Sequence, residues 1–94
     1  MTFEWDNAKN EANIIKHGIS FEKASEAFAD SNALDIIDDL HSDFEDRFIT
    51  IGRTTDGLVL VVWTERADDA IRIISVRWAT KREARQYYAH MELQ

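Results

Sequence analysis

The feature that most constrains the fold of this chain is a pair of β-type runs joined by a short turn sequence. Residues 47–54 and 58–65 are rich in β-branched and aliphatic side chains, and Thr55-Asp56-Gly57 separates them. An Asp-Gly pair supplies the positive backbone dihedrals that a tight hairpin requires. The sequence therefore predicts an antiparallel hairpin whose second strand carries the apolar run 58–63 and is buried.

A third strand and a terminal helix follow the hairpin. Alternation along residues 71–78 predicts a strand on which Arg72 and Arg77 leave opposite faces. Thr80 and Glu83 have the spacing of a capping box, which predicts a helix from Lys81 to about residue 91. Strands joined by short turns pair antiparallel, so these runs belong to one sheet.

The N-terminal part of the sequence predicts an extended start, two helices and an edge strand at residues 33–37. Asp6 is a good cap for a first helix closed by Gly18, and Ser20 for a second that runs to about Ala29. In the first helix, spacing predicts that one set of residues is buried and a second set is exposed on a solvated face. The buried set is Trp5, Ala8, Ala12, Ile15 and Ile19; the exposed set is Lys9, Asn13 and Lys16.

Together these elements predict one α+β domain over residues 1–94, with two N-terminal helices, an antiparallel sheet of three to four strands and a C-terminal helix. The helices are too few to cover both sheet faces, so part of the sheet is expected to bind something. No apolar run reaches the roughly 18 residues of a membrane span. The start of the chain has no apolar leader, which predicts a cytoplasmic protein.

Charge is divided unevenly along the chain. The formal net charge is −7, yet residues 1–46 hold twelve acidic residues against three lysines, and residues 71–94 hold five basic residues against two acidic ones. All the arginines fall in the second half: Arg47, Arg53, Arg66, Arg72, Arg77, Arg82 and Arg85. An acidic chain repels phosphodiesters overall, so this distribution indicates a local anion site rather than a general nucleic-acid coat.

Several short motifs occur in an order that resembles the BrnT toxin family across essentially the whole chain. They are Phe3-Glu4-Trp5-Asp6, Lys16-His17-Gly18, Ser20-Phe21-Glu22, Glu45-Asp46-Arg47-Phe48, Gly52-Arg53, Thr64-Glu65-Arg66 and the run 71–77, with Lys9, Asn13, Ala79, Arg82 and Tyr87 between and after them. The resemblance implies a RelE-like ribonuclease that arrests growth by cutting RNA. It also implies a co-encoded BrnA-like antitoxin, a heterotetramer of two toxins and two antitoxins, and DNA binding only through the antitoxin.

Metal-independent RNA cleavage requires a proton acceptor for the 2′-hydroxyl, cations around the phosphorus and a proton donor for the leaving 5′-oxygen. The arginine fork matches phosphate oxygens, so we expect Arg66, Arg72 and Arg77 around the scissile phosphate. Lys9, Glu45 and Glu65, with His17 and His41, are the candidates for proton transfer. The expected RNA-binding residues are Lys16, His17, Arg53, Arg82 and Tyr87, the tyrosine through stacking on a base.

Each of these residues also has a purely structural interpretation. Arg66 fits a surface ion pair at a turn, Arg72 a sheet edge, and His17 an interaction with the helix dipole. A non-catalytic module that binds a cognate protein through its open sheet is the alternative function. Metal ligands are available at His41, Asp43 and Glu45, or at Asp35, Asp38 and Asp39, but neither set has a known metal-binding spacing. We therefore expect no metal and no cofactor.

Overall fold

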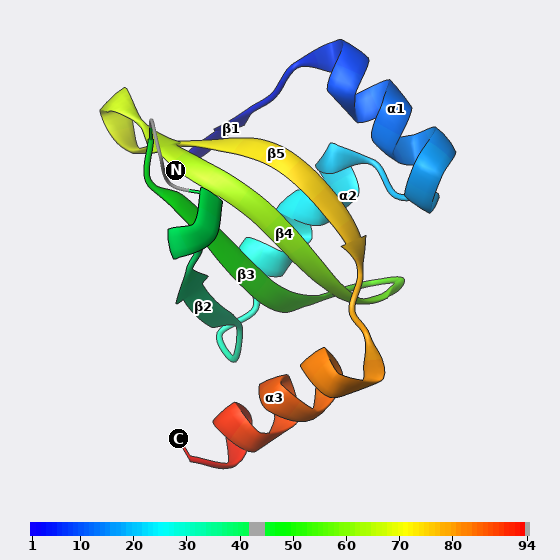
Figure 1. The fold of residues 1–94 in the computed structure, drawn as a ribbon, viewed down its shortest axis with the longest axis vertical. Coiled ribbons are helices and arrows are strands. Elements are labelled where there is room, and N and C mark those ends of the chain that lie inside the picture. Colours follow the sequence, from blue (N-terminus) through cyan, green and yellow to red (C-terminus); the bar gives the residue numbers. More distant parts are fainter. Residues whose placement is uncertain (42–44, 94) are drawn as a thin grey trace.

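The computed structural model describes residues 1–41 and 45–93, and it places them in a five-stranded sheet with helices on both sides (Figure 1). The strands are β1 (Thr2–Glu4), β2 (Leu34–Ile37), β3 (Arg47–Thr54), β4 (Gly57–Arg66) and β5 (Ala70–Trp78). The α-helices are α1 (Asn7–His17), α2 (Phe21–Ser25) and α3 (Lys81–Glu92). Three short 3₁₀ segments join them: η1 (Glu26–Ala29), η2 (Asp39–His41) and η3 (Ala67–Asp69).

The α+β prediction is confirmed, and the sheet has one strand more than the sequence indicated. The strand order is β1-β5-β4-β3-β2, and the four longer strands pair antiparallel. The extended start of the chain adds β1, which pairs parallel with the first residues of β5. The sheet is therefore mixed, and β2 is confirmed as an edge strand.

Side-chain caps fix the predicted helix starts. Asp6, Ser20 and Thr80 each accept a hydrogen bond from the backbone N–H three residues on, and Thr80 with Glu83 completes the capping box. Gly18 closes α1 with a φ of 74°. The second helix changes character at Glu26, where α2 gives way to η1. The tight hairpin is also confirmed, although the positive φ lies at Gly57 and not at Asp56.

The predicted orientation of α1 is wrong in part. Lys9 and Lys16 are exposed and Ile19 is buried, as predicted. Ile15, however, is 88% exposed, whereas Asn13 is 7% exposed and faces the sheet. The Asn13 amide donates to the carbonyls of Ile19 and Val76 at 3.0 and 2.8 Å and accepts from the Val76 N–H at 3.2 Å. Because β1 pairs only with residues 70–72, the outer edge of β5 lacks a strand partner at Val76. Buried backbone groups must be hydrogen-bonded, so the asparagine takes the place of a strand there.

The prediction that Arg72 and Arg77 leave opposite faces of the sheet is also wrong, because β5 contains a β-bulge. Val62 pairs with Ser75 and the next residue, Trp63, pairs with Ile73, so Ile74 is an extra residue on β5. One extra residue reverses the alternation of every side chain beyond it. Arg72 and Arg77 therefore lie on the same face.

The two sheet faces are covered differently. The α2 and η1 segments lie behind the sheet in Figure 1 and bury the main core, which includes Phe21, Val61 and Ile73. The other face is covered at one end by α3, through Tyr87 against Ile51 and Leu60. No α-helix of the described residues covers the rest of that face, which carries both Arg72 and Arg77; we call it the open face.

Candidate functional site

A row of side chains crosses four strands at one end of the open face. Glu4 of β1 pairs with Arg72 of β5, Arg72 with Thr64 of β4, and Thr64 with Arg47 of β3. Directly paired residues project their side chains from the same face, about 5 Å apart. The sheet register therefore places two arginines and a carboxylate in line, although they are distant in the sequence.

Arg66 joins this row from the end of β4 and Glu45 from the segment before β3. The closest nitrogen–oxygen distances are 3.7 Å from Arg72 to Glu4, 3.8 and 3.6 Å from Arg66 to Glu4 and Glu45, and 3.8 Å from Arg47 to Glu45. We call Glu4, Glu45, Arg66 and Arg72 the strand-end cluster. Its contacts are longer than hydrogen bonds, and its side chains are between a third and a half exposed, so an anion can replace a carboxylate at small cost.

A hollow of about 240 Å³ lies beside this cluster. Its lining residues include Glu45, Asp46, Glu65 and Arg66, so three acidic residues and one guanidinium line the same small space. Thr64 is 2% exposed and donates its hydroxyl to the Asp46 carbonyl at 2.7 Å, which ties the end of β4 to the segment before β3. The hollow thus has a fixed wall with charged groups of both signs.

Arg77 is held in another way, at the start of α3. Its two terminal nitrogens donate to the two Glu83 carboxylate oxygens, each at 2.8 Å. This bidentate hydrogen bonding lowers the pKa of Glu83 and raises that of Arg77. The Arg77–Glu83 pair is therefore a structural clamp between β5 and α3, and its guanidinium is already fully engaged on one side.

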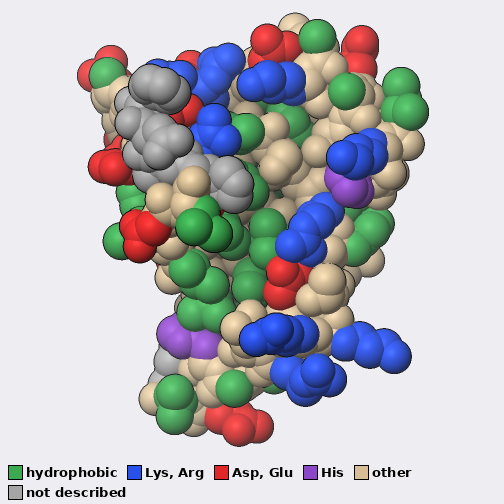
Figure 2. Space-filling model, viewed as in Figure 1, with side chains coloured by type: hydrophobic (Ala, Val, Ile, Leu, Met, Phe, Trp, Pro, Cys, Tyr) green, Lys and Arg blue, Asp and Glu red, His purple; other side chains and the backbone are tan. Residues whose placement is uncertain are grey.

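A larger groove, of about 460 Å³, lies on the open face between the strand-end cluster and α3. Its floor is aliphatic, formed by Ile49, Leu60, Val62 and Ile74, and its edges include Arg47, Arg77, Leu40 and Asp38. Figure 2 views this face and shows Lys and Arg side chains at the upper end of the sheet and again over α3, with apolar side chains between them. The cationic groups therefore frame an apolar floor.

The other predicted residues lie elsewhere. Lys9 and Lys16 are exposed on α1, and His17 is half-buried at its end. This helix packs along β5, and within residues 1–41 and 45–93 no ion pair or hydrogen bond joins these three to the strand-end cluster. Arg82 is exposed on α3. The side chain of His41 and the whole of Asp43 lie outside the described residues.

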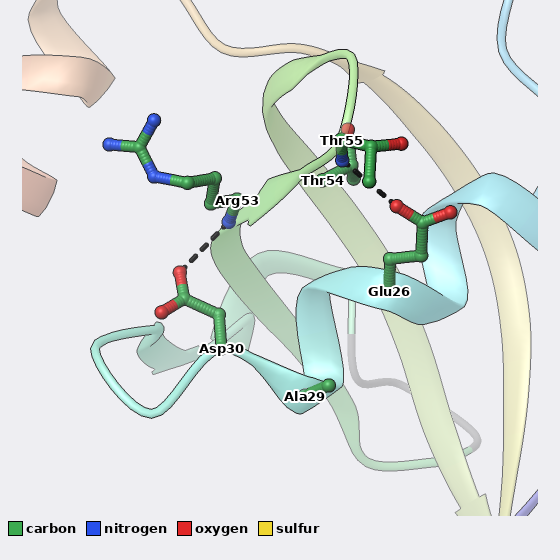
Figure 3. A pocket seen from close by; sticks show the side chains of 6 residues that line it. All are labelled: Glu26, Ala29, Asp30, Arg53, Thr54 and Thr55. Atoms are coloured by element: carbon green, nitrogen blue, oxygen red, sulfur yellow. Dashed lines mark hydrogen bonds between the residues drawn. The ribbon is translucent and has the colours of Figure 1, made fainter.

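Arg53 belongs to a separate hollow of about 390 Å³ beside η1, shown in Figure 3. The backbone N–H of Arg53 donates to the Asp30 carboxylate. This carboxylate also accepts from the Tyr87 hydroxyl at 2.7 Å and from the Asn32 backbone N–H. Burial opposes the ionisation of Asp30, but these three hydrogen bonds outweigh it and lower its pKa. Arg53 points away from Glu26 and Thr55 and donates to the Tyr88 hydroxyl at 2.9 Å.

Tyr87 does not fit a base-stacking role. Its ring is 1% exposed and forms part of the core, where burial and the Asp30 carboxylate raise its pKa. The neighbouring Tyr88 is 42% exposed, beside Arg53. The sequence does not show which of the two tyrosines is buried, because they are adjacent residues of the same predicted helix.

Glu4 and Thr64 belong to the candidate site, and the sequence did not predict a role for either. A parallel pairing of the first residues with β5 is needed to bring Glu4 to Arg72, and a three-residue strand gives no periodic signal for it. Thr64 was part of a motif but had no assigned role. Among the described residues no group of three or more His, Cys, Asp or Glu side chains is placed to hold a metal ion, and no helix is long and apolar enough to cross a membrane.

Comparison with known proteins first gives the class of fold. The chain is similar to the crystal structure of the Brucella abortus ribonuclease toxin BrnT, with a TM-score of 0.63 and 24% sequence identity, over 86% of this chain and 99% of that one. The structure thus has the α+β fold of that toxin. A search of curated proteins gives no match.

The family follows from the sequence. The family model described as "Ribonuclease toxin, BrnT, of type II toxin-antitoxin system" matches residues 5–83. The chain therefore belongs to the BrnT family, as the order of its motifs indicated, and is a BrnT-type ribonuclease toxin of a toxin–antitoxin system.

Proposed function

We propose that this protein is an endoribonuclease that cleaves RNA without a metal at the strand-end cluster, and that this activity arrests growth. The observation that carries the proposal is the cluster itself: Arg66 and Arg72 share loose ion pairs with Glu4 and Glu45 on the open face of the sheet. A scissile phosphate is a better partner for two guanidinium forks than a carboxylate 3.6 to 3.8 Å away.

The chemistry assigned to these residues is transfer of the phosphoryl group to the neighbouring 2′-oxygen. Glu45, on the wall of the small hollow, takes the proton of the 2′-hydroxyl as that oxygen bonds to phosphorus. The bond from phosphorus to the 5′-oxygen breaks, and the 5′-oxygen leaves with a proton from Glu65, which lines the same hollow, or from water. The products carry a 2′,3′-cyclic phosphate and a free 5′-hydroxyl.

The two arginines stabilise the charge that develops during this step. Arg66 and Arg72 stay protonated at any working pH, so they supply positive charge to the equatorial oxygens and do not shuttle protons. Arg77 is assigned a different part. Its pairing with Glu83 holds α3 against β5 and fixes the far end of the groove that receives the RNA chain.

Net acidity does not prevent this activity if most of the carboxylates lie away from the RNA. The acidic residues are concentrated in residues 1–46. Glu4 and Glu45 of this segment do lie in the strand-end cluster, where their ion-pair partners are Arg47, Arg66 and Arg72. Electrostatic capture of free RNA is nevertheless weaker than for a basic protein, and affinity should fall with salt in proportion to the few phosphates that these arginines neutralise.

The family implies an antitoxin partner. We propose that it is a BrnA-like protein that neutralises the toxin in a heterotetramer of two toxins and two antitoxins, with DNA bound only through the antitoxin. Co-expression tests this point: the chain alone should stop growth of a bacterial host, and the protein encoded beside it should restore growth.

The enzymatic proposal is tested with purified protein and a 5′-labelled single-stranded RNA in the presence of EDTA. Cleavage that leaves 2′,3′-cyclic phosphate ends supports it. If folded protein produces 3′-hydroxyl ends, or cuts only when a divalent ion is added, the proposed chemistry is wrong.

A further inference from the structure

The β2 strand has a backbone edge directed away from the sheet. It is the last strand in the order β1-β5-β4-β3-β2, and it lies at the sheet margin in Figure 1. The Asp38 N–H donates to the Arg47 carbonyl at 2.8 Å, which fixes the hydrogen-bonded pairs of this ladder. In an antiparallel ladder these pairs alternate, so Asp35 and Ile37 direct their N–H and C=O groups outward.

This edge has only part of the protection that natural edge strands carry. The strand is short and includes Asp35, but residues 34–37 hold no lysine, proline or bulge, and their pairing with β3 is regular. Ile36 and Ile37 are 39% and 62% exposed, and Leu40, just beyond the strand, is 85% exposed. The edge is thus largely apolar and regular enough to pair with another strand.

The charges around the edge select the kind of partner. Asp35, Asp38 and Asp39 lie on or directly after β2, and residues 1–46 hold twelve acidic residues against three lysines. These carboxylates repel the phosphates of RNA, so the edge does not suit the substrate. They attract a polypeptide with lysines or arginines.

We propose that β2 is the docking site for an extended segment of a partner protein, in which basic residues alternate with apolar ones, and which adds to the sheet as a sixth strand. The added strand lies about 5 Å beyond β2 and makes main-chain hydrogen bonds with Asp35 and Ile37. On the open face, its apolar side chains pack beside Ile36 and Leu40.

This docking mode has a consequence for the groove. Leu40 and Asp38 are on the groove edge, with Arg47 and Arg77 across the same space. Side chains of a strand bound at β2 therefore reach the groove and compete with RNA for it. The identification of the partner as the antitoxin rests on the proposed function; the binding mode does not.

The test uses a synthetic nine-residue peptide of alternating valine and lysine and the ¹⁵N-labelled full chain, observed by NMR. Saturable shifts concentrated on β2, with slower hydrogen exchange at the amides of Asp35 and Ile37, are expected. Two peptides serve as controls: one with prolines in place of alternate residues, which cannot form the ladder, and one with glutamate in place of lysine. Neither should bind.

A matched pair of protein variants locates the site. Ile37→Lys adds a charge at the edge and should weaken peptide binding by about tenfold or more through like-charge repulsion. Ile15→Lys makes the same change at an equally apolar and more exposed residue of α1, and should leave binding unchanged. The proposal is overturned if the peptide does not bind, if the proline peptide binds equally well, or if Ile15→Lys is the variant that weakens binding. Because no RNA is involved, failure of the ribonuclease proposal leaves these results interpretable.

Discussion

Two arginine arrangements on the same sheet face differ in how tightly they are held. In the strand-end cluster, Arg66 and Arg72 face Glu4 and Glu45 at 3.6 to 3.8 Å. At the other end of the groove, Arg77 makes two 2.8 Å hydrogen bonds to Glu83. A guanidinium in a short bidentate pair must lose charge-assisted hydrogen bonds before it can bind a phosphate. The looser pair needs far less rearrangement, so we assign catalysis to the strand-end cluster and structure to the Arg77–Glu83 pair.

The difference arises from where the carboxylates are anchored. Glu83 is fixed by the capping box, in which it accepts from the Thr80 N–H at 2.9 Å, so its position relative to Arg77 is set by the start of α3. Glu4 ends the three-residue strand β1, and Glu45 precedes β3; both are shared between two arginines. Shared carboxylates cannot give each arginine a complete bidentate partner.

The largest effect is expected for Arg72→Ala. Loss of one preorganised cation at the transition state should reduce the single-turnover cleavage rate by about 10²- to 10³-fold. Its ion pair is long and partly exposed, so the free energy of unfolding should change by only about 0.5 kcal/mol. Rates from labelled RNA and urea unfolding measure the two quantities. A variant that loses stability and keeps its rate would reverse the assignment.

Glu45→Gln tests the proton transfer in the same cluster. The amide keeps the shape but cannot accept the proton, so the rate should fall by about 10²-fold. The free energy of unfolding should change little, which separates this role from a purely structural one. Glu26→Gln is the control, because Glu26 lies in the separate hollow beside Arg53. An unchanged rate in Glu45→Gln would move the base to another residue.

Arg77→Ala should lower the stability more, and the cleavage rate less, than Arg72→Ala does. Removal of Arg77 leaves the Glu83 carboxylate, 18% exposed, without its main partner and should cost about 1 to 2 kcal/mol of stability. Cleavage at a temperature where the variant stays folded should fall by less than about tenfold, since a groove contact and not a transition-state contact is lost. A loss as large as that of Arg72→Ala would show that Arg77 also acts on the phosphate.

The smallest expected effect is on how the stability of the protein depends on pH. The folded pKa of Glu83 lies below its ordinary value of 4.5, because Arg77 donates two hydrogen bonds to the carboxylate. A lowered folded pKa stabilises the protein above the ordinary value and loses that contribution as the pH falls through the folded pKa. Stability should therefore decline below about pH 4.5, and the decline should be shallower in Glu83→Gln. Urea midpoints between pH 3 and 7 measure this, and parallel curves for the two proteins would contradict it.

Local sequence signals predicted the elements well because they act over a few residues. The caps at Asp6, Ser20 and Thr80 and the turn at Gly57 each depend on one side chain or one dihedral. The same signals placed Arg47, Arg53, Arg72 and Arg77 in strands, as the structure has them. These signals do not depend on which strands become neighbours.

The site itself depends on long-range pairing, which sequence reasoning could not supply. The extra residue at Ile74 brings Arg77 to the face of Arg72, and nothing in an Ile-Ile-Ser sequence marks a bulge. Glu4 reaches Arg72 only because β1 pairs parallel with β5. Asn13 is buried because it satisfies the edge of β5, which overrides the apolar spacing of α1.

The most direct test of the central assignment is the ratio of single-turnover cleavage rates for Arg72→Ala and Arg77→Ala, measured in EDTA on one labelled single-stranded RNA with both proteins shown to be folded. We predict a 2′,3′-cyclic phosphate product from the wild type and a rate at least about tenfold lower for Arg72→Ala than for Arg77→Ala. Equal rates for the two variants, or a slower Arg77→Ala, would contradict the division of roles between the strand-end cluster and the Arg77–Glu83 pair.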